Sequence, residues 1–208
     1  MITLYHCEGA RSFRPLWMME EMGLPYELKM LPFPPRVHAR DYLAINPLGT
    51  IPFFIEDEAR MTESSAICHY LGVHHGPTPL IVAPEEPAYP LFLNWMYFSD
   101  ATLTFPQTLV LRYSQLEAKE RRLPQVVEDY ARWFHGRLRA VEAALKDGET
   151  LCAGRFTAAD IAIGYALRLA ETIGLSKAFQ PNVASYLEKL RKRDGYQRAL
   201  AAEARKAA

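Results

Sequence analysis

The chain has 208 residues, half of them hydrophobic, so it is long enough to bury a sizeable core in one large domain or two modest ones. Its 24 basic and 24 acidic side chains cancel, which argues against nucleic acid as a partner and favours a small molecule. No apolar run approaches the roughly 20 residues of a membrane span, and the opening residues lack the pattern of a signal peptide. We therefore expect a cytoplasmic protein with no membrane partner.

The cysteines set a limit on metal and redox chemistry. Cys7, Cys68 and Cys152 are odd in number, far apart and in no C-x-x-C pair. This spacing predicts neither a disulfide framework nor a cysteine zinc site, and it weakens a redox role of the thioredoxin type. We expect three reduced thiols and no metal.

The first part of the chain alternates between strand-like and helix-like segments. β-Branched and aromatic residues predict strands at residues 2–7, 26–31, 51–57 and 59–63. Apolar residues at helical spacing predict helices at residues 12–24, 36–46 and 64–75. The order βαβαββα is typical of an α/β domain with a mixed sheet, which we assign to residues 1–76.

The composition changes after this domain. Five prolines between residues 77 and 90 predict a linker. Beyond it, only helical periodicity remains, so we expect an all-helical bundle over residues 91–208. Pro106 should kink or interrupt the first helix of this bundle. The predicted helices are residues 91–117, 123–147, 157–174 and 182–204.

Polar residues stand where two of these helices should begin. In "TESSAICHYL", Glu63 and Ser64 either cap the helix or receive a ligand, with Glu63 meeting an ammonium group and the helix N-terminus a carboxylate. In "FTAADIAIG", Thr157 and Asp160 have the spacing of a capping box, for which we expect a role in folding and not in catalysis. The strand start "NPLGTIPFF" contains Pro52, and the residues alone leave its peptide bond open as cis or trans.

Taken together, four segments resemble the cytosolic glutathione S-transferases of bacterial type, over essentially the whole chain. They are "GARSFRPLWMMEEMGLPYEL", "NPLGTIPFF", "TESSAICHYL" and "FTAADIAIGYAL". The resemblance implies a thioredoxin-like first domain with a cis bond before Pro52, followed by an all-helical domain. It also implies glutathione as co-substrate and a homodimer.

The resemblance further implies which residues hold glutathione. The backbone that precedes the cis-proline would pair with the cysteinyl amide. The Glu-Ser pair at the start of the predicted helix 64–75 would hold the γ-glutamyl ammonium and carboxylate. One of two basic residues after the second strand would supply a contact for the glycyl end, unless they belong to a solvated basic loop. The implied residues are Ile51, Pro52, Glu63, Ser64, Arg36 and His38.

The loop after the first strand departs from one branch of this family. Relatives with a catalytic Cys have it in the context Gly-Ala-Cys-Ser, whereas this chain reads "GARS", with Arg11 at the Cys position and Ser12 retained. Cys-dependent thiol chemistry is therefore disfavoured, and Cys7 lies four positions too early. We expect Ser12 to donate a hydrogen bond to the glutathione thiolate, with Arg11 as an alternative source of stabilisation. A plain helix cap is the competing interpretation of Ser12.

The second substrate would lie over the thiolate, between the domains, against the first long helix of the bundle. Aromatic residues at helical spacing there either line a pocket or belong to the core. The candidates are Tyr97, Phe105, Arg112 and Tyr113.

The sequence thus favours an enzyme that adds the glutathione thiolate to a small hydrophobic electrophile. Ether cleavage and isomerisation would use the same thiolate. A non-catalytic module that binds glutathione or a protein is the alternative from a different class.

Overall fold

The computed structural model describes residues 1–204 and contains two compact units. The first combines residues 1–81 with residues 191–204, and the second comprises residues 82–190. The predicted division, which gave the helical domain everything after residue 90, therefore differs from the observed one. The reason is that the helix α9 (Asp194–Glu203) packs against the first unit. Residues 205–208 of the predicted helical part lie outside the described residues.

The sheet of the first unit is mixed, as predicted. Its strands lie in the order β2-β1-β3-β4. β1 runs parallel to β2, with Leu4 opposite Leu28, and antiparallel to β3, with Leu4 opposite Phe54. The expected thioredoxin-like architecture is confirmed. The strands are β1 (Ile2–His6), β2 (Tyr26–Met30), β3 (Phe53–Glu56) and β4 (Ala59–Met61).

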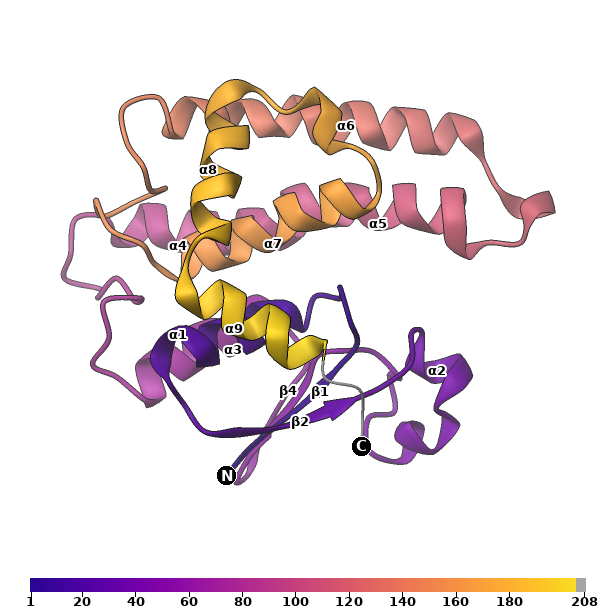
Figure 1. Ribbon diagram of the computed structural model, residues 1–208, viewed down its shortest axis with the longest axis horizontal. Coiled ribbons are helices and arrows are strands. Elements are labelled where there is room, and N and C mark those ends of the chain that lie inside the picture. Colours follow the sequence, from indigo (N-terminus) through magenta and orange to yellow (C-terminus); the bar gives the residue numbers. More distant parts are fainter. Residues whose placement is uncertain (205–208) are drawn as a thin grey trace. The chain divides into compact units, whose positions relative to one another are not determined.

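Helices cover the sheet because its strands alternate between buried and partly exposed residues. In β1, Ile2, Leu4 and His6 are buried, while the two residues between them are only partly so. Figure 1 shows α1, α3 and α9 stacked along one side of the strands. The predicted helix 36–46 is divided into the short helix α2 and a 3₁₀ turn. These elements are α1 (Phe13–Met22), α2 (Pro35–His38), the turn Arg40–Ala44 and α3 (Ser64–His74).

The contact between α9 and α1 is aromatic and close. The ring of Tyr196 lies edge-on to those of Phe13 and Trp17, with centroids 5.3 and 4.9 Å apart. Gly195 permits this approach, because a Cβ at that position would lie 2.5 Å from the Glu21 side chain. The start of α9 therefore belongs to the core of the first unit.

The second unit is helical throughout the described residues, as predicted. One long helical segment contains α4, α5 and two π-helical stretches. The first π-helical stretch ends at Thr104, two residues before Pro106. Pro106 thus interrupts the regular hydrogen bonding as expected, because it has no N–H to donate. No described helix is both long and apolar enough to cross a membrane. The helices are α4 (Tyr89–Tyr97), α5 (Phe105–Leu111), α6 (Pro124–Ala144), α7 (Ala158–Thr172) and α8 (Pro181–Arg191), and the π-helical stretches are Phe98–Thr104 and Arg112–Leu116.

The predicted capping box at α7 is present. The Thr157 hydroxyl accepts a bond from the Ala159 N–H, and the Asp160 carboxylate accepts one from the Thr157 N–H at 2.8 Å. Asp160 also accepts bonds from the Leu151 N–H at 3.1 Å and the Tyr186 hydroxyl at 2.7 Å. Burial raises the pKa of Asp160, while these hydrogen bonds oppose the rise. The Asp160 carboxylate therefore caps α7 and joins it to the preceding loop and to α8, which is the expected structural role.

An ion pair fixes the loop that leads into α7. The Arg155 guanidinium binds the Glu86 carboxylate through two parallel bonds of 2.7 and 2.8 Å. Glu86 also accepts a bond from the Ala83 N–H at 2.8 Å. The hydrogen bonds from Arg155 and Ala83 lower the pKa of Glu86 to about 2.

Candidate functional site

The loop between β1 and α1 places the two predicted thiol-activating residues in different environments. The Arg11 side chain is exposed, whereas Ser12 is fully buried. Ser12 precedes α1 but does not cap it; its Oγ accepts a bond of 3.4 Å from the Cys7 N–H. A hydroxyl that accepts one bond still has its proton to donate.

Backbone N–H groups at the start of α1 already donate hydrogen bonds to carbonyl groups of the preceding loop. The Phe13 N–H donates to the Ala10 carbonyl at 2.9 Å, and the Arg14 N–H donates to the Arg11 carbonyl at 3.1 Å. Pro15 has no N–H. The first turn of α1 therefore offers its dipole to a nearby anion but not these backbone donors.

Cys7 lies in an apolar environment that suppresses its ionisation. The side chain is buried in a cluster with Tyr42, Ile51 and Phe53. Burial raises the pKa of the Cys7 thiol to about 12, so this thiol is neutral at pH 7. This observation supports the expectation that Cys7 is not the nucleophile. The same cluster connects the end of β1 to Ile51, the residue expected to contact the cysteinyl part of glutathione.

The turn before β3 is held by a small hydrogen-bond network. The Tyr42 hydroxyl and the Asn46 amide both donate to the Thr50 carbonyl, at 2.8 and 2.9 Å. Gly49 has a φ of +59°, which favours glycine, and a Cβ there would lie 2.8 Å from the Cβ of Arg36. The peptide bond between Ile51 and Pro52 is cis, as the family resemblance implied.

The two basic residues predicted for the glycyl end lie on α2. Arg36 and His38 are both exposed, and the stem of Arg36 lies beside the turn at Gly49. The structure thus brings Arg36 close to the segment that contains Ile51. Within residues 1–204 neither basic side chain forms a hydrogen bond or an ion pair, and their contact with the glycyl end is a prediction.

Glu63 and Ser64 stand at the start of α3, as predicted. Glu63 is exposed and does not cap the helix. Ser64 is buried, and its hydroxyl accepts a bond of 2.9 Å from the Arg14 guanidinium. Arg14 is itself fully buried, so a permanent positive charge lies directly behind the helix start.

Sequence reasoning missed Arg14 as part of this site. An arginine on a helix usually lies at the surface, so the sequence pattern indicated only that Arg14 belongs to the predicted helix 12–24. A signal was nevertheless present, because Arg14 follows Phe13 and precedes "PLW", a stretch that is buried throughout. A charged residue inside such a run needs a partner, and Ser64 is one of its partners.

The four residues predicted to line a substrate pocket all lie on the helical segment of α4 and α5 in the second unit. Tyr97 and Phe105 are among the most exposed large side chains, at 73% and 55%. The Arg112 guanidinium donates to Glu117 at 2.8 Å and lies over the Tyr113 ring, 5.4 Å from its centroid. The charge of Arg112 therefore already has a carboxylate partner.

Comparisons with known proteins point to one family. A family model described as "Glutathione S-transferase, N-terminal domain" matches residues 10–74, which contain the α1 and α3 helix starts. This part of the chain is a glutathione S-transferase N-terminal domain. Glutathione S-transferase GstA of Escherichia coli O157:H7 is 26% identical over 97% of this chain and 98% of its own length.

Further relatives are consistent with the family. Glutathione S-transferase 3 of Schizosaccharomyces pombe is 35% identical, but the match covers 50% of this chain and spans only 43% of that protein. The crystal structure of a glutathione transferase from Methylococcus capsulatus superposes with a TM-score of 0.85 at 25% identity, with 98% of each chain covered.

Proposed function

We propose that this chain is a member of the glutathione S-transferase family that binds glutathione at the start of α3 and transfers its thiolate to a small hydrophobic electrophile. The observation that carries the proposal is the group formed by Glu63, Ser64 and Arg14. It presents an exposed carboxylate, a hydroxyl and a buried positive charge at one helix N-terminus. An amino acid end group, with its ammonium and carboxylate, is complementary to such a group.

In this proposal each part of glutathione has its own contact. Glu63 meets the γ-glutamyl ammonium, and the Ser64 hydroxyl receives the neighbouring carboxylate with the charge of Arg14 behind it. The backbone of Ile51 pairs with the cysteinyl amide. Arg36 or His38 meets the glycyl carboxylate, which is supported by the position of Arg36 beside the Gly49 turn.

Transfer requires the glutathione thiol to ionise. A thiol with a pKa near 8.5 is only a few per cent ionised at neutral pH, and lowering this pKa to about 6.5 requires roughly 2.7 kcal/mol. A charge-assisted hydrogen bond from Ser12 supplies about 1.5–3 kcal/mol, and the Arg11 charge or the dipole of α1 adds to it. The thiolate sulfur then forms a bond to an electrophilic carbon. In a displacement, the bond from this carbon to its leaving group breaks and the group departs as an anion. In an addition, the electron pair of the double bond moves to the neighbouring atom, which takes up a proton.

The expected electrophile is aromatic or unsaturated. The exposed rings of Tyr97 and Phe105 support this choice, with Arg112 and Tyr113 further along the same segment. We also expect the protein to be cytoplasmic and to form a homodimer. Sedimentation of the purified chain would test the dimer. Ether cleavage and isomerisation use the same thiolate and are separated by assaying each substrate class.

The test is the ultraviolet absorbance of the bound thiolate, titrated against pH with the glutathione-free protein subtracted. We expect the bound thiol to titrate at least one unit below free glutathione. Ser12→Ala should return the pKa toward its free value if Ser12 is the donor, and Arg11→Ala should do so if the arginine charge dominates. An unshifted thiol in the wild-type complex contradicts transfer, and absence of binding contradicts the whole proposal.

One observation favours a second function, glutathione binding without transfer. Ser12 has no exposed surface, so a thiolate reaches its Oγ only if the loop moves. In that case glutathione binds, Glu63→Gln weakens binding, and the thiol pKa stays at its free value in wild type and Ser12→Ala alike.

A further inference from the structure

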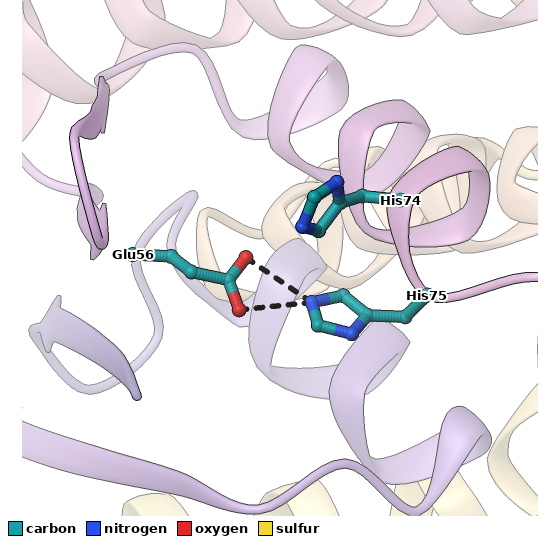
Figure 2. Close-up of side chains that lie close together, drawn as sticks. All are labelled: Glu56, His74 and His75. Carbon is teal, nitrogen blue, oxygen red and sulfur yellow. Dashed lines mark hydrogen bonds and ion pairs between the residues drawn. The ribbon is translucent and has the colours of Figure 1, made fainter.

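Three potential metal ligands converge at the other end of α3. Both oxygens of the Glu56 carboxylate lie within hydrogen-bond distance of His75 Nε2, at 3.0 and 3.1 Å, and the His74 ring lies beside them (Figure 2). One ligand atom from each of the three residues lies within 4.8 Å of the other two. Glu56 is buried, His75 is partly exposed and His74 is exposed, so the group is open to solvent on one side.

The fold explains why Glu56 lies next to two histidines that are 18 and 19 positions later in the sequence. Glu56 ends β3 and points to the same face of the sheet as Phe54, because side chains alternate along a strand. Phe54 packs edge-on against Tyr70 of α3, with ring centroids 5.7 Å apart. Tyr70 in turn stacks on His74, one helical turn later, at 5.0 Å.

The end of α3 brings the two histidines together. Neighbouring residues within a helix point about 100° apart, so adjacent histidines seldom share a ligand. His75 has left the helical conformation, with φ of −105° and ψ of 16°, and its ring lies edge-on to that of His74 with centroids 5.0 Å apart. Both rings therefore reach the Glu56 carboxylate.

We propose that Glu56, His74 and His75 form a binding site for one divalent ion of the zinc type, such as Zn²⁺, Ni²⁺ or Cu²⁺. Two imidazoles and one carboxylate are ligands that these ions favour, whereas Mg²⁺ and Ca²⁺ prefer oxygen ligands alone. Three protein ligands leave a position for water or a further ligand. The ion would replace the direct bond between Glu56 and His75.

The distances require a modest closure. Ligand bonds of about 2.0–2.2 Å place donor atoms at most about 4.4 Å apart around one ion, compared with the present 4.8 Å limit. His74 is exposed and supplies this movement by rotating its side chain. Glu56 is buried and its carboxylate already lies against His75 Nε2, so these two ligands need little movement.

The proposed metal site is separate from the glutathione site. Glu63 and Ser64 precede or begin α3, whereas His74 ends this helix of 11 residues, a separation of about 15 Å along the axis. The metal proposal therefore stands or fails independently of the transferase proposal.

The test uses the full chain without a histidine tag, treated with a chelator and titrated with Zn²⁺ by calorimetry. We expect one ion to bind per chain and Mg²⁺ not to bind. Glu56→Gln, His74→Asn and His75→Asn should each weaken Zn²⁺ binding by at least about tenfold. His38→Asn is the matched control, because it removes an exposed histidine from α2 and should leave Zn²⁺ affinity unchanged.

Two further measurements separate a metal site from a simple ion pair. Zn²⁺ should raise the thermal unfolding midpoint of the wild type but not of His74→Asn, since an ion that binds only the folded chain stabilises it. Binding should also weaken in acid, because protons compete with the ion for the ligand atoms. If wild type binds no Zn²⁺, or if His38→Asn weakens binding as much as His74→Asn does, the proposal is wrong.

Discussion

The helices α3 and α7 begin with similar polar sequences but use them differently. At α7, Thr157 and Asp160 are buried and cap their own helix. The Asp160 carboxylate accepts four hydrogen bonds. At α3, Glu63 remains exposed without capping, and Ser64 contacts Arg14 of another helix. A helix start that satisfies its own amides is structural, whereas one whose side chains point elsewhere is suited to a ligand.

The largest effect should come from the α7 start. Asp160→Ala leaves several buried donors without an acceptor, so the free energy of unfolding should fall by about 3–4 kcal/mol in urea denaturation. Thr157→Ser, which keeps the capping hydroxyl, should cost under about 1 kcal/mol. Glutathione affinity should be unchanged in the folded fraction of Asp160→Ala. A stability loss no larger than that of Thr157→Ser would contradict the structural assignment.

Arg14 should give the next largest effect, this time on the ligand side of the comparison. Arg14→Met removes the charge behind Ser64, and glutathione affinity measured by calorimetry should fall by about 10- to 100-fold, equivalent to about 1.5–3 kcal/mol. Arg14→Lys keeps the charge without the guanidinium fork and should recover part of this loss. If stability falls in both variants while affinity is unchanged, Arg14 acts in folding alone.

Glu63 sharpens the contrast because its effect should be confined to binding. Glu63→Gln should weaken glutathione binding by about tenfold, or about 1.4 kcal/mol, with a stability change within about 0.5 kcal/mol. Glu58→Gln, which neutralises another exposed carboxylate in the same unit, is the matched control and should change neither quantity. A loss of stability without a loss of affinity would show that Glu63 behaves like the α7 cap after all.

The smallest effect concerns the ion pair that leads into α7. Because Arg155 lowers the pKa of Glu86 from 4.5 to about 2, ionised Glu86 stabilises the folded state above pH 4.5, and this contribution is lost as the pH falls through about 2. Both side chains are about one third exposed, so the contribution should be small. Urea unfolding of wild type and Glu86→Gln should differ most above pH 4.5 and converge in acid. A difference that does not change with pH would contradict this assignment.

Local patterns predicted most of the fold. Strand and helix periodicity gave the mixed sheet and the helical second part, and the spacing of Thr157 and Asp160 gave the α7 cap. The path of α9 was not predictable in this way, because its aromatic contacts join Tyr196 to Phe13 and Trp17 across most of the chain. Periodicity shows that a helix has an apolar face but not which surface that face covers.

The candidate site was predictable only in part, for a related reason. The family motifs located Glu63, Ser64 and the cis bond at Pro52. They did not indicate that Arg14 is buried behind Ser64, or that Ser12 has no exposed surface, since burial depends on residues distant in sequence. The same limit applies to Glu56 and the histidines, which only the packing of β3 on α3 brings together.

The assembly of the first unit from two separated segments has a consequence for synthesis on the ribosome. Residues 1–81 emerge first, but α9 follows only after the 109 residues of the second unit. At translation rates of about 5–20 residues per second, the α9-facing sides of Phe13 and Trp17 wait roughly 5–20 s for Tyr196. At the end of that interval the second unit is complete while the first still lacks α9, so folding need not follow chain order. The nascent first unit is then a natural client for chaperones that shield aromatic surface.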